Sequence, residues 1–156
     1  GLGGYLNIIP FTKVQQQIRE KSPEAYLTLM MRICMMKIAN MTARGINSKC
    51  LITGESLAQV ASQTVENLTV TNSYAEFPVF RPLIGLDKEE ITIEAKEIGT
   101  YETSILPYED CCVMFSPKHP ILHSNLKDAA EIFERMEIGG LLEEAYAQRE
   151  VKKMSF

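Results

Sequence analysis

The sequence lacks a long apolar run, has few cysteines and carries no excess of positive charge, and each absence excludes a class of protein. The most apolar segment, residues 27–41, is interrupted by charged and polar side chains. It falls short of the ~20 continuous apolar residues that a membrane span needs. With 16 basic and 20 acidic residues, the chain has no dominant basic surface to hold nucleic-acid phosphates by itself. The four cysteines are too few for a secreted disulfide scaffold, and no signal-peptide pattern opens the sequence, so we expect a cytoplasmic protein.

Short apolar runs alternate with stretches of helical periodicity, which is typical of an α/β protein. The predicted strands cover residues 5–9, 50–54 and 77–85, and the first is expected to be buried. The predicted helices cover residues 11–20, 23–45, 55–68, 88–98, 126–136 and 141–153. Because strands that alternate with helices usually pair in parallel, we expect a parallel sheet with helices on both faces.

Two helix starts carry local signals. Ser22 is placed to cap the long apolar helix, with Pro23 at its first position and Gly45 at its end. Asp87 and Glu90 form a capping-box pattern for the helix that follows them. Because the long helix is apolar on nearly every side, we expect it to pack between layers.

A glycine turn, TGES at residues 53–56, follows the second predicted strand. Ligands of parallel sheets bind at the carboxyl ends of strands, where a glycine lets the backbone approach a base or a phosphate. Glu55, Gln59 and Gln63 recur at four-residue spacing and are expected on the polar face of the next helix. One glycine makes neither a Walker loop nor a dinucleotide fingerprint. Gly54 therefore belongs either to a nucleotide site or to a plain strand-to-helix turn.

Arg32 lies in the middle of the long apolar helix. Burying an unpaired guanidinium is costly, so this side chain is expected to reach solvent at the sheet edge or to pair with an anion. The anion could be a carboxylate or a phosphate. A structural ion pair and a ligand contact both remain open.

Two adjacent cysteines, Cys111 and Cys112, lie in the segment PYEDCCVMFSPKHP, residues 107–120. His119 and His123 could complete a zinc site, but adjacent cysteines rarely face one ion and the spacing matches no zinc motif, so we predict no metal site. A vicinal disulfide would be strained and, in the cytoplasm, reduced. Either a nucleophilic thiolate activated by a nearby cation or two inert buried thiols remains. Both histidines are expected in exposed loops.

Several longer segments stand in the same order as in a known enzyme family. They are IIPFTKVQ, the ASQTVENL that follows TGES, RPLIGLDKEEI, and EIGTYETSILPYEDCCVMFSPKHP. Together they resemble the C-terminal part of the catalytic domain of the tRNA 4-thiouridine synthetases (ThiI), also called tRNA uracil 4-sulfurtransferases. The similarity runs over essentially the whole chain, which makes it more specific than any single motif.

The resemblance implies a fold of the adenine nucleotide alpha-hydrolase (PP-loop ATPase) type. It implies an enzyme that uses ATP, with Mg²⁺, to adenylate the 4-oxygen of a tRNA uridine before a persulfide delivers sulfur. By match to the family, Arg32, Gly54 and Gln63 contact the nucleotide, and Cys111 rather than Cys112 takes part in sulfur transfer. The implied partners are tRNA, a cysteine desulfurase as sulfur donor and a sulfur-carrier protein of thiamine synthesis. The expected assembly is a homodimer.

The family's SGGxDS pyrophosphate loop, its tRNA-binding THUMP region and a rhodanese domain are absent from these residues. We therefore expect residues 1–156 to be the C-terminal part of the thiolation domain, inactive by itself and with an open sheet edge. Two alternatives remain. One is a PP-loop ATP-pyrophosphatase that adenylates another substrate, and the other is a non-catalytic, dimerising fragment.

Overall fold

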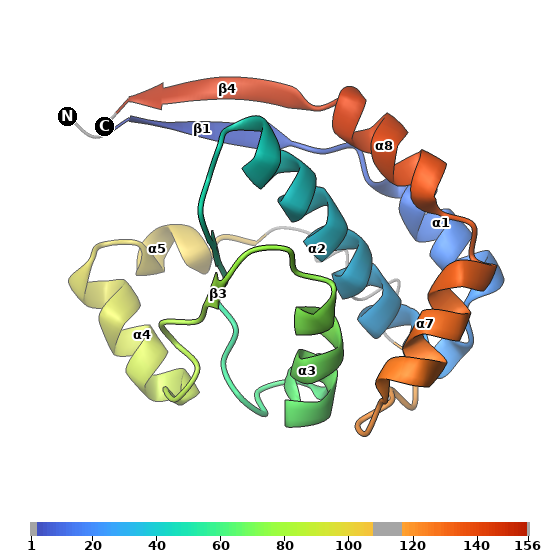
Figure 1. Cartoon of the computed structure of the whole chain (residues 1–156). Helices are drawn as coiled ribbons and strands as arrows, with labels where there is room; N and C mark the ends of the chain where they lie inside the picture. Colours follow the sequence, from blue (N-terminus) through green and yellow to red (C-terminus); the bar gives the residue numbers. More distant parts are fainter. Residues whose placement is uncertain (1–2, 108–116, 156) are drawn as a thin grey trace.

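The computed structural model of the chain describes residues 3–107 and 117–155 (Figure 1). The chain combines helices with two separate pairs of strands, one of them parallel, so the predicted α/β class is confirmed. Cys111 and Cys112 lie outside the described residues. In the two described segments, no helix is long and apolar enough to cross a membrane.

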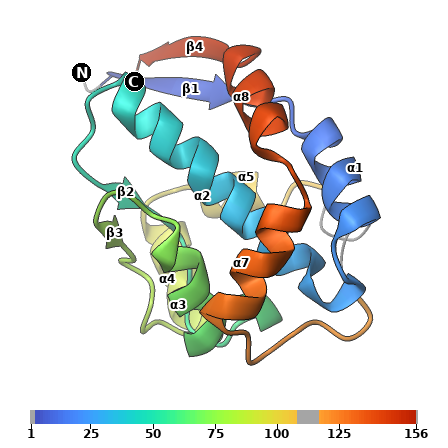
Figure 2. The same ribbon diagram turned by 45° about the vertical axis from the view of Figure 1, so that its right-hand side comes forward.

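The core forms around helix α2, Leu27–Gly45, which is apolar on most sides. It packs against α1 (Thr12–Lys21), α3 (Val65–Ser73) and α8 (Gly139–Ala147), and α7 (Leu126–Arg135) closes the helical body (Figure 2). The largest fully buried apolar side chains are Leu29, Met30, Ile33, Met136, Ile138 and Leu142. The expected position of the long helix between other elements is confirmed.

The parallel pair consists of two very short strands, both inside predicted strand segments. Leu51–Ile52 (β2) lies beside Val79–Phe80 (β3), with Leu51 opposite Val79 and Ile52 opposite Phe80. The amide of Thr53 still donates to the carbonyl of Phe80 at 3.0 Å, so the chain leaves β2 next to β3. Both strands therefore end at the same edge.

The first predicted strand exists, but the prediction that it is buried was wrong. Gly3–Ile8 (β1) pairs antiparallel with Glu150–Ser155 (β4) and does not join the parallel strands. Tyr5 is 66% exposed, and every residue of β4 is exposed. The helix predicted over residues 141–153 is also wrong in its second half, because α8 ends at Ala147 and pairing with β1 overrides the helical pattern beyond it.

The long helix begins later than its cap signal predicted. A 3₁₀ turn, Glu24–Tyr26 (η1), precedes α2, and the Ser22 hydroxyl donates to the carbonyl of Pro23 at 3.2 Å instead of capping a helix. Gly45 ends the helix as predicted.

The segment after TGES does not continue straight into a helix. It forms a loop and a 3₁₀ turn, Ala61–Gln63 (η2), before α3 starts at Val65. The cap of α3 is Thr64, whose Oγ1 accepts a hydrogen bond from the amide of Asn67 at 3.2 Å. The apolar spacing that predicted one helix over residues 55–68 was therefore misleading.

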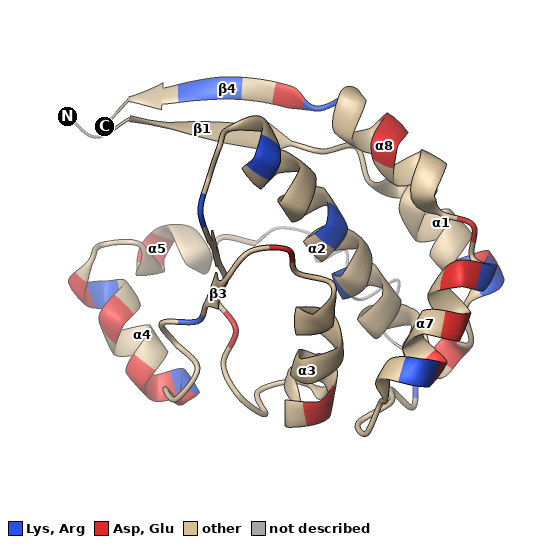
Figure 3. Ribbon diagram, in the orientation of Figure 1, with Lys and Arg blue, Asp and Glu red and all other residues tan. Residues whose placement is uncertain are grey.

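The predicted capping box is confirmed at Lys88–Glu97 (α4). Asp87 accepts hydrogen bonds from the amides of Glu89 and Glu90, and the Glu90 carboxylate accepts from the amide of Asp87. Gly99, at φ +73°, ends the helix before the short α5, Tyr101–Ser104. Both acidic and basic residues occur along α4 and α7 (Figure 3), in line with the chain's small net charge of −4.

Candidate functional site

A cavity of about 410 Å³ lies at the carboxyl end of β2. Its walls come from the middle of α2, from the loop after β2, and from η2 and α3. Arg32, Gly54 and Gln63 all line it. The structure thus brings together the three residues for which the family resemblance implies contact with a nucleotide.

Arg32 enters the cavity wall from α2 and forms an ion pair with Glu55. Its Nη2 donates to Oε1 of Glu55. Of the two open possibilities for this arginine, the ion pair with a carboxylate is therefore present, and it lies at the cavity that would hold a ligand.

Glu55 was predicted on the polar face of a helix, and this was wrong. Its side chain is only 3% exposed. The second carboxylate oxygen, Oε2, accepts from Thr53 Oγ1 at 2.8 Å and from Arg81 Nε at 2.6 Å. The available signal in the sequence was Arg32 itself, because a guanidinium in an apolar helix needs either access to solvent or a nearby anion such as this carboxylate.

Arg81 follows β3 directly and was not among the predicted site residues. Its Nη1 donates to Oδ1 of Asn72 on α3 at 3.1 Å, which ties the arginine to a second element. Burial lowers the pKa of Arg81 below its ordinary value, but an arginine stays protonated at neutral pH. Glu55 is therefore a buried carboxylate shared by two guanidinium groups.

Gly54 leaves space in the cavity, and Gln63 provides a hydrogen-bond acceptor there. A Cβ atom built on Gly54 would meet no atom within 4 Å, so packing among the described residues does not require a glycine here. The side-chain Oε1 of Gln63 is buried and has no hydrogen-bond partner in the described part of the chain. Buried polar atoms are normally paired, so a ligand or water with a donor group fits this position.

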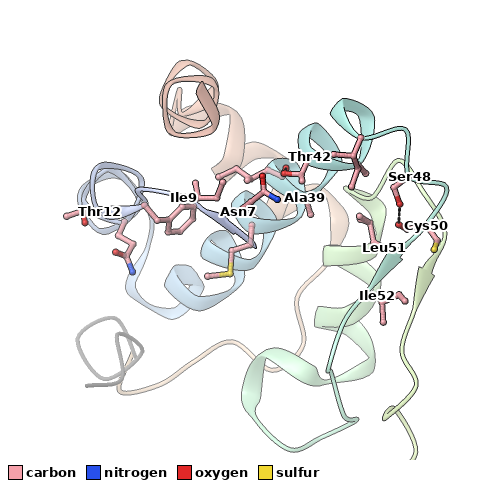
Figure 4. Close-up of a pocket in the computed structure, with 15 residues that line it drawn as sticks. Asn7, Ile9, Thr12, Ala39, Thr42, Ser48, Cys50, Leu51 and Ile52 are labelled. Atoms are coloured by element: carbon pink, nitrogen blue, oxygen red, sulfur yellow. Dashed lines mark hydrogen bonds between the residues drawn. The ribbon is translucent and has the colours of Figure 1, made fainter. Parts of the chain in front are cut away.

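A larger cavity, of about 730 Å³, lies between β1 and β2 (Figure 4). Its lining is mostly apolar, with Asn7 and Thr42 among the few polar side chains. Of the predicted site residues that the structure describes, none lines it. It shares Met35, Ala39, Leu51 and Ile52 with the smaller cavity, so the two are neighbours.

The described cysteines and histidines do not contribute to the smaller cavity. Cys34 is fully buried in α2, and burial raises the pKa of its thiol to about 12. His119 and His123 are exposed in loops, as predicted, and His123 Nδ1 lies 2.8 Å from Glu66 Oε1. Residues 3–107 and 117–155 contain no group of three or more histidine, cysteine or acidic side chains that could hold a metal.

A cavity at the carboxyl end of a parallel strand, walled by helices and lined by both polar and apolar side chains, is typical of the open α/β class, in which ligands bind at that edge. Comparison with known families is more specific. The chain belongs to the family described as thiamine biosynthesis protein (ThiI), whose profile matches residues 2–138.

Proteins with similar sequences are described by the same name. A protein of Treponema pallidum (strain Nichols) described as "Probable tRNA sulfurtransferase" is 51% identical over 149 residues, which cover 96% of this chain and 37% of that protein. A Caldanaerobacter subterraneus subsp. tengcongensis protein of the same name is 54% identical over 137 residues, or 88% of this chain and 36% of the relative. The chain therefore spans less than half of the length of these relatives.

A solved structure also matches. It is the crystal structure of a complex between a 4-thiouridine synthetase and RNA with bound ATP, and it superposes with a TM-score of 0.93 at 40% sequence identity. The match covers 99% of this chain and 40% of the other. The fold described above is thus a partial domain of the kind found in that synthetase.

Proposed function

We propose that the chain is the C-terminal part of the ATP-dependent thiolation domain of a tRNA sulfurtransferase, which converts a tRNA uridine to 4-thiouridine in the cytoplasm. The observation that carries this proposal is the convergence of Arg32, Gly54 and Gln63 on one cavity at the carboxyl end of β2. The similar synthetase of known structure, a complex with RNA and bound ATP, supports the proposal.

The cavity fits a nucleotide in three ways. Arg32 offers a guanidinium of the type that binds phosphates. Gly54 leaves open space for a ligand to approach the backbone. The unpaired amide oxygen of Gln63 can accept a hydrogen bond from a group such as the amino group of adenine. Mg²⁺ would arrive on the phosphates of ATP, since no metal-holding cluster occurs in the described segments.

The reaction would use ATP as a substrate that activates the uridine. The 4-oxygen attacks the α-phosphorus, and pyrophosphate leaves. The terminal sulfur of a persulfide on Cys111 then attacks C4, and AMP leaves with the former 4-oxygen. A second thiol attacks the Cys111 sulfur, which releases 4-thiouridine and leaves a disulfide at Cys111 that a thiol reductant reopens.

The partners would divide the remaining tasks. A cysteine desulfurase would place the persulfide sulfur on Cys111, and a sulfur-carrier protein would take the same sulfur toward the thiazole of thiamine. With 16 basic and 20 acidic residues, this chain has no excess of positive charge, so regions outside it would hold most of the tRNA. Two copies of the protein would form a homodimer.

The larger apolar cavity supports the partial-domain part of the proposal. It lies between β1 and β2, which do not pair with each other, and Ile46 and Ile52 at its wall are 65% and 70% exposed. We expect the upstream part of the domain to pack there and to join the open strand edges. Adding the upstream part of the Treponema pallidum relative should slow alkylation of Cys50, which lines this cavity. An unchanged rate would contradict this packing.

Persulfide mapping tests the proposed function directly. The protein is incubated with a cysteine desulfurase and free cysteine and then alkylated, and added sulfur is located by peptide mass spectrometry. Cys111→Ser and Cys112→Ser variants are treated in parallel. We expect persulfide on Cys111 that only the Cys111 variant loses. Equal labelling of all cysteines, both alone and with the upstream part added, would favour an ATP-pyrophosphatase that does not transfer sulfur.

A further inference from the structure

Glu55 connects the cavity to the rest of the fold through both of its carboxylate oxygens. Oε1 accepts from Arg32 on α2, and Oε2 accepts from Arg81 after β3. Thr53 donates to the same Oε2, and Arg81 also donates to Asn72 on α3. Side chains from α2, the β2 loop, the β3 end and α3 therefore meet in one group of hydrogen bonds.

This network of hydrogen bonds restricts the conformations of the Arg32 side chain before any ligand binds. A free arginine samples many rotamers, and binding has to order them at an entropic cost. Here Glu55 holds one end of the Arg32 guanidinium, and Thr53 and Arg81 hold Glu55. With a side chain only 3% exposed, Glu55 itself has little freedom to move. The guanidinium is thus already ordered at the cavity wall.

We propose that Glu55 is a positioning residue, which holds the Arg32 guanidinium where it meets the phosphates of ATP, and that Arg81 fixes Glu55 in turn. This inference rests on the proposed function, because ATP is the ligand it concerns. Glu55 also lines the cavity, but its side chain is only 3% exposed and both of its carboxylate oxygens already accept hydrogen bonds, so it acts on the ligand through Arg32. Its loss should therefore weaken the binding of phosphate-bearing ligands and leave the binding of the nucleoside alone unaffected.

The test uses a hybrid in which this chain is joined to the upstream part of the Treponema pallidum relative, which is 51% identical to it over 149 residues. Calorimetry measures the Kd of ATP and of adenosine for the hybrid and for its Glu55→Gln variant. Glutamine keeps the size of the side chain but removes the charge that holds Arg32. We expect the Kd of ATP to rise about tenfold or more, as the loss of one charge-assisted hydrogen bond predicts, with the Kd of adenosine unchanged.

Three further variants sharpen the result. Glu55→Asp keeps the charge on a shorter side chain and should restore part of the ATP affinity. Arg81→Gln removes the group that fixes Glu55 and should raise the Kd of ATP less than Glu55→Gln does. Glu76→Gln is the matched control, since it breaks the exposed Arg44–Glu76 ion pair away from the cavity and should leave both affinities unchanged.

The outcomes separate the inference from the proposed function. If Glu55→Gln weakens ATP and adenosine equally, Glu55 only maintains the fold, and the inference is wrong. An unchanged ATP affinity would also overturn it, while the proposed function stands. If the unmodified hybrid binds no ATP, the proposed function fails, and the inference that rests on it fails with it.

Discussion

The two strand pairs of this protein differ in length and in what lies at their ends. The antiparallel pair, β1 and β4, has six residue pairs and is exposed over most of its length. The parallel pair, β2 and β3, has only two, yet the smaller cavity and the Glu55 ion pairs lie at its carboxyl ends. Helix α2 and buried side-chain contacts, rather than a long ladder of backbone hydrogen bonds, therefore position the candidate site.

The alkylation rates of the two described cysteines show how accessible the start of β2 is compared with the core. Among these predictions, we expect the largest effect here. Cys50 directly precedes β2 and is half-buried, whereas Cys34 is fully buried in α2 with a pKa raised from 9.0 to about 12. This shift lowers the thiolate fraction at pH 8 by about 1000-fold. We expect Cys34 to react with iodoacetamide at least about 1000-fold more slowly in the folded protein than in urea. Cys50 should react in both states.

The same shift gives a pH dependence with a defined sign. The unfolded thiol of Cys34 loses its proton near its ordinary pKa of 9.0, and the folded thiol keeps its proton to about 12. The stabilising contribution is therefore complete below pH 9 and decreases as the pH rises toward 12. Urea unfolding of the Cys34→Ala variant should show a shallower loss of stability above pH 9. If the free energy of unfolding fell equally steeply with pH in the original protein and in the variant, the raised pKa of Cys34 would be contradicted.

Removing Glu55, which follows β2, and Glu150, which lies in β4, compares how much ion pairs stabilise the two regions. Glu55→Ala leaves two partly buried arginines without their shared carboxylate and should lower the free energy of unfolding by about 3 kcal/mol. Glu150→Ala in β4 breaks an exposed pair with Lys152 and should change it by less than about 0.5 kcal/mol. Urea denaturation measures both. Similar losses would mean that the short parallel pair is not held by its ion pairs.

Alanine variants of two glycines distinguish an effect on ligand binding from an effect on packing. A Cβ atom on Gly54 at the cavity, or on Gly4 in β1, would meet no atom within 4 Å. Gly54→Ala and Gly4→Ala should therefore each change stability by less than about 0.5 kcal/mol. In the hybrid, only Gly54→Ala should reduce ATP affinity, about tenfold, because its methyl group occupies space the ligand needs. Equal affinities in both variants would remove Gly54 from the nucleotide site.

Deleting residues 150–156 tests the antiparallel pair, and we expect a smaller loss of stability than for Glu55→Ala. Isolated two-stranded pairs are marginal in water, and no residue of β4 is buried, so we expect a loss of about 1 kcal/mol in urea unfolding. A loss of about 3 kcal/mol or more, as for a core residue, would show that this pair supports the helical body.

The sequence correctly predicted features that depend on residues close together in the chain. The capping box at Asp87 and Glu90 formed as expected, because both partners lie within one helical turn. The α2 region was correctly predicted as a core helix, since a helix apolar on most sides can only be buried. The three cavity residues could be selected only through the family resemblance, and the ion-pair partner of Arg32 could not be named.

By itself, the sequence determined the α/β class, the buried helix around Arg32, and the glycine turn at the end of a strand. Only the tertiary structure decided that Glu55 is buried between Arg32 and Arg81, and that residues 150–155 pair with β1 instead of extending a helix. The physical reason is the same in both cases. A carboxylate's burial and a strand's pairing depend on partners distant in the chain, and short-range periodicity carries no information about those partners.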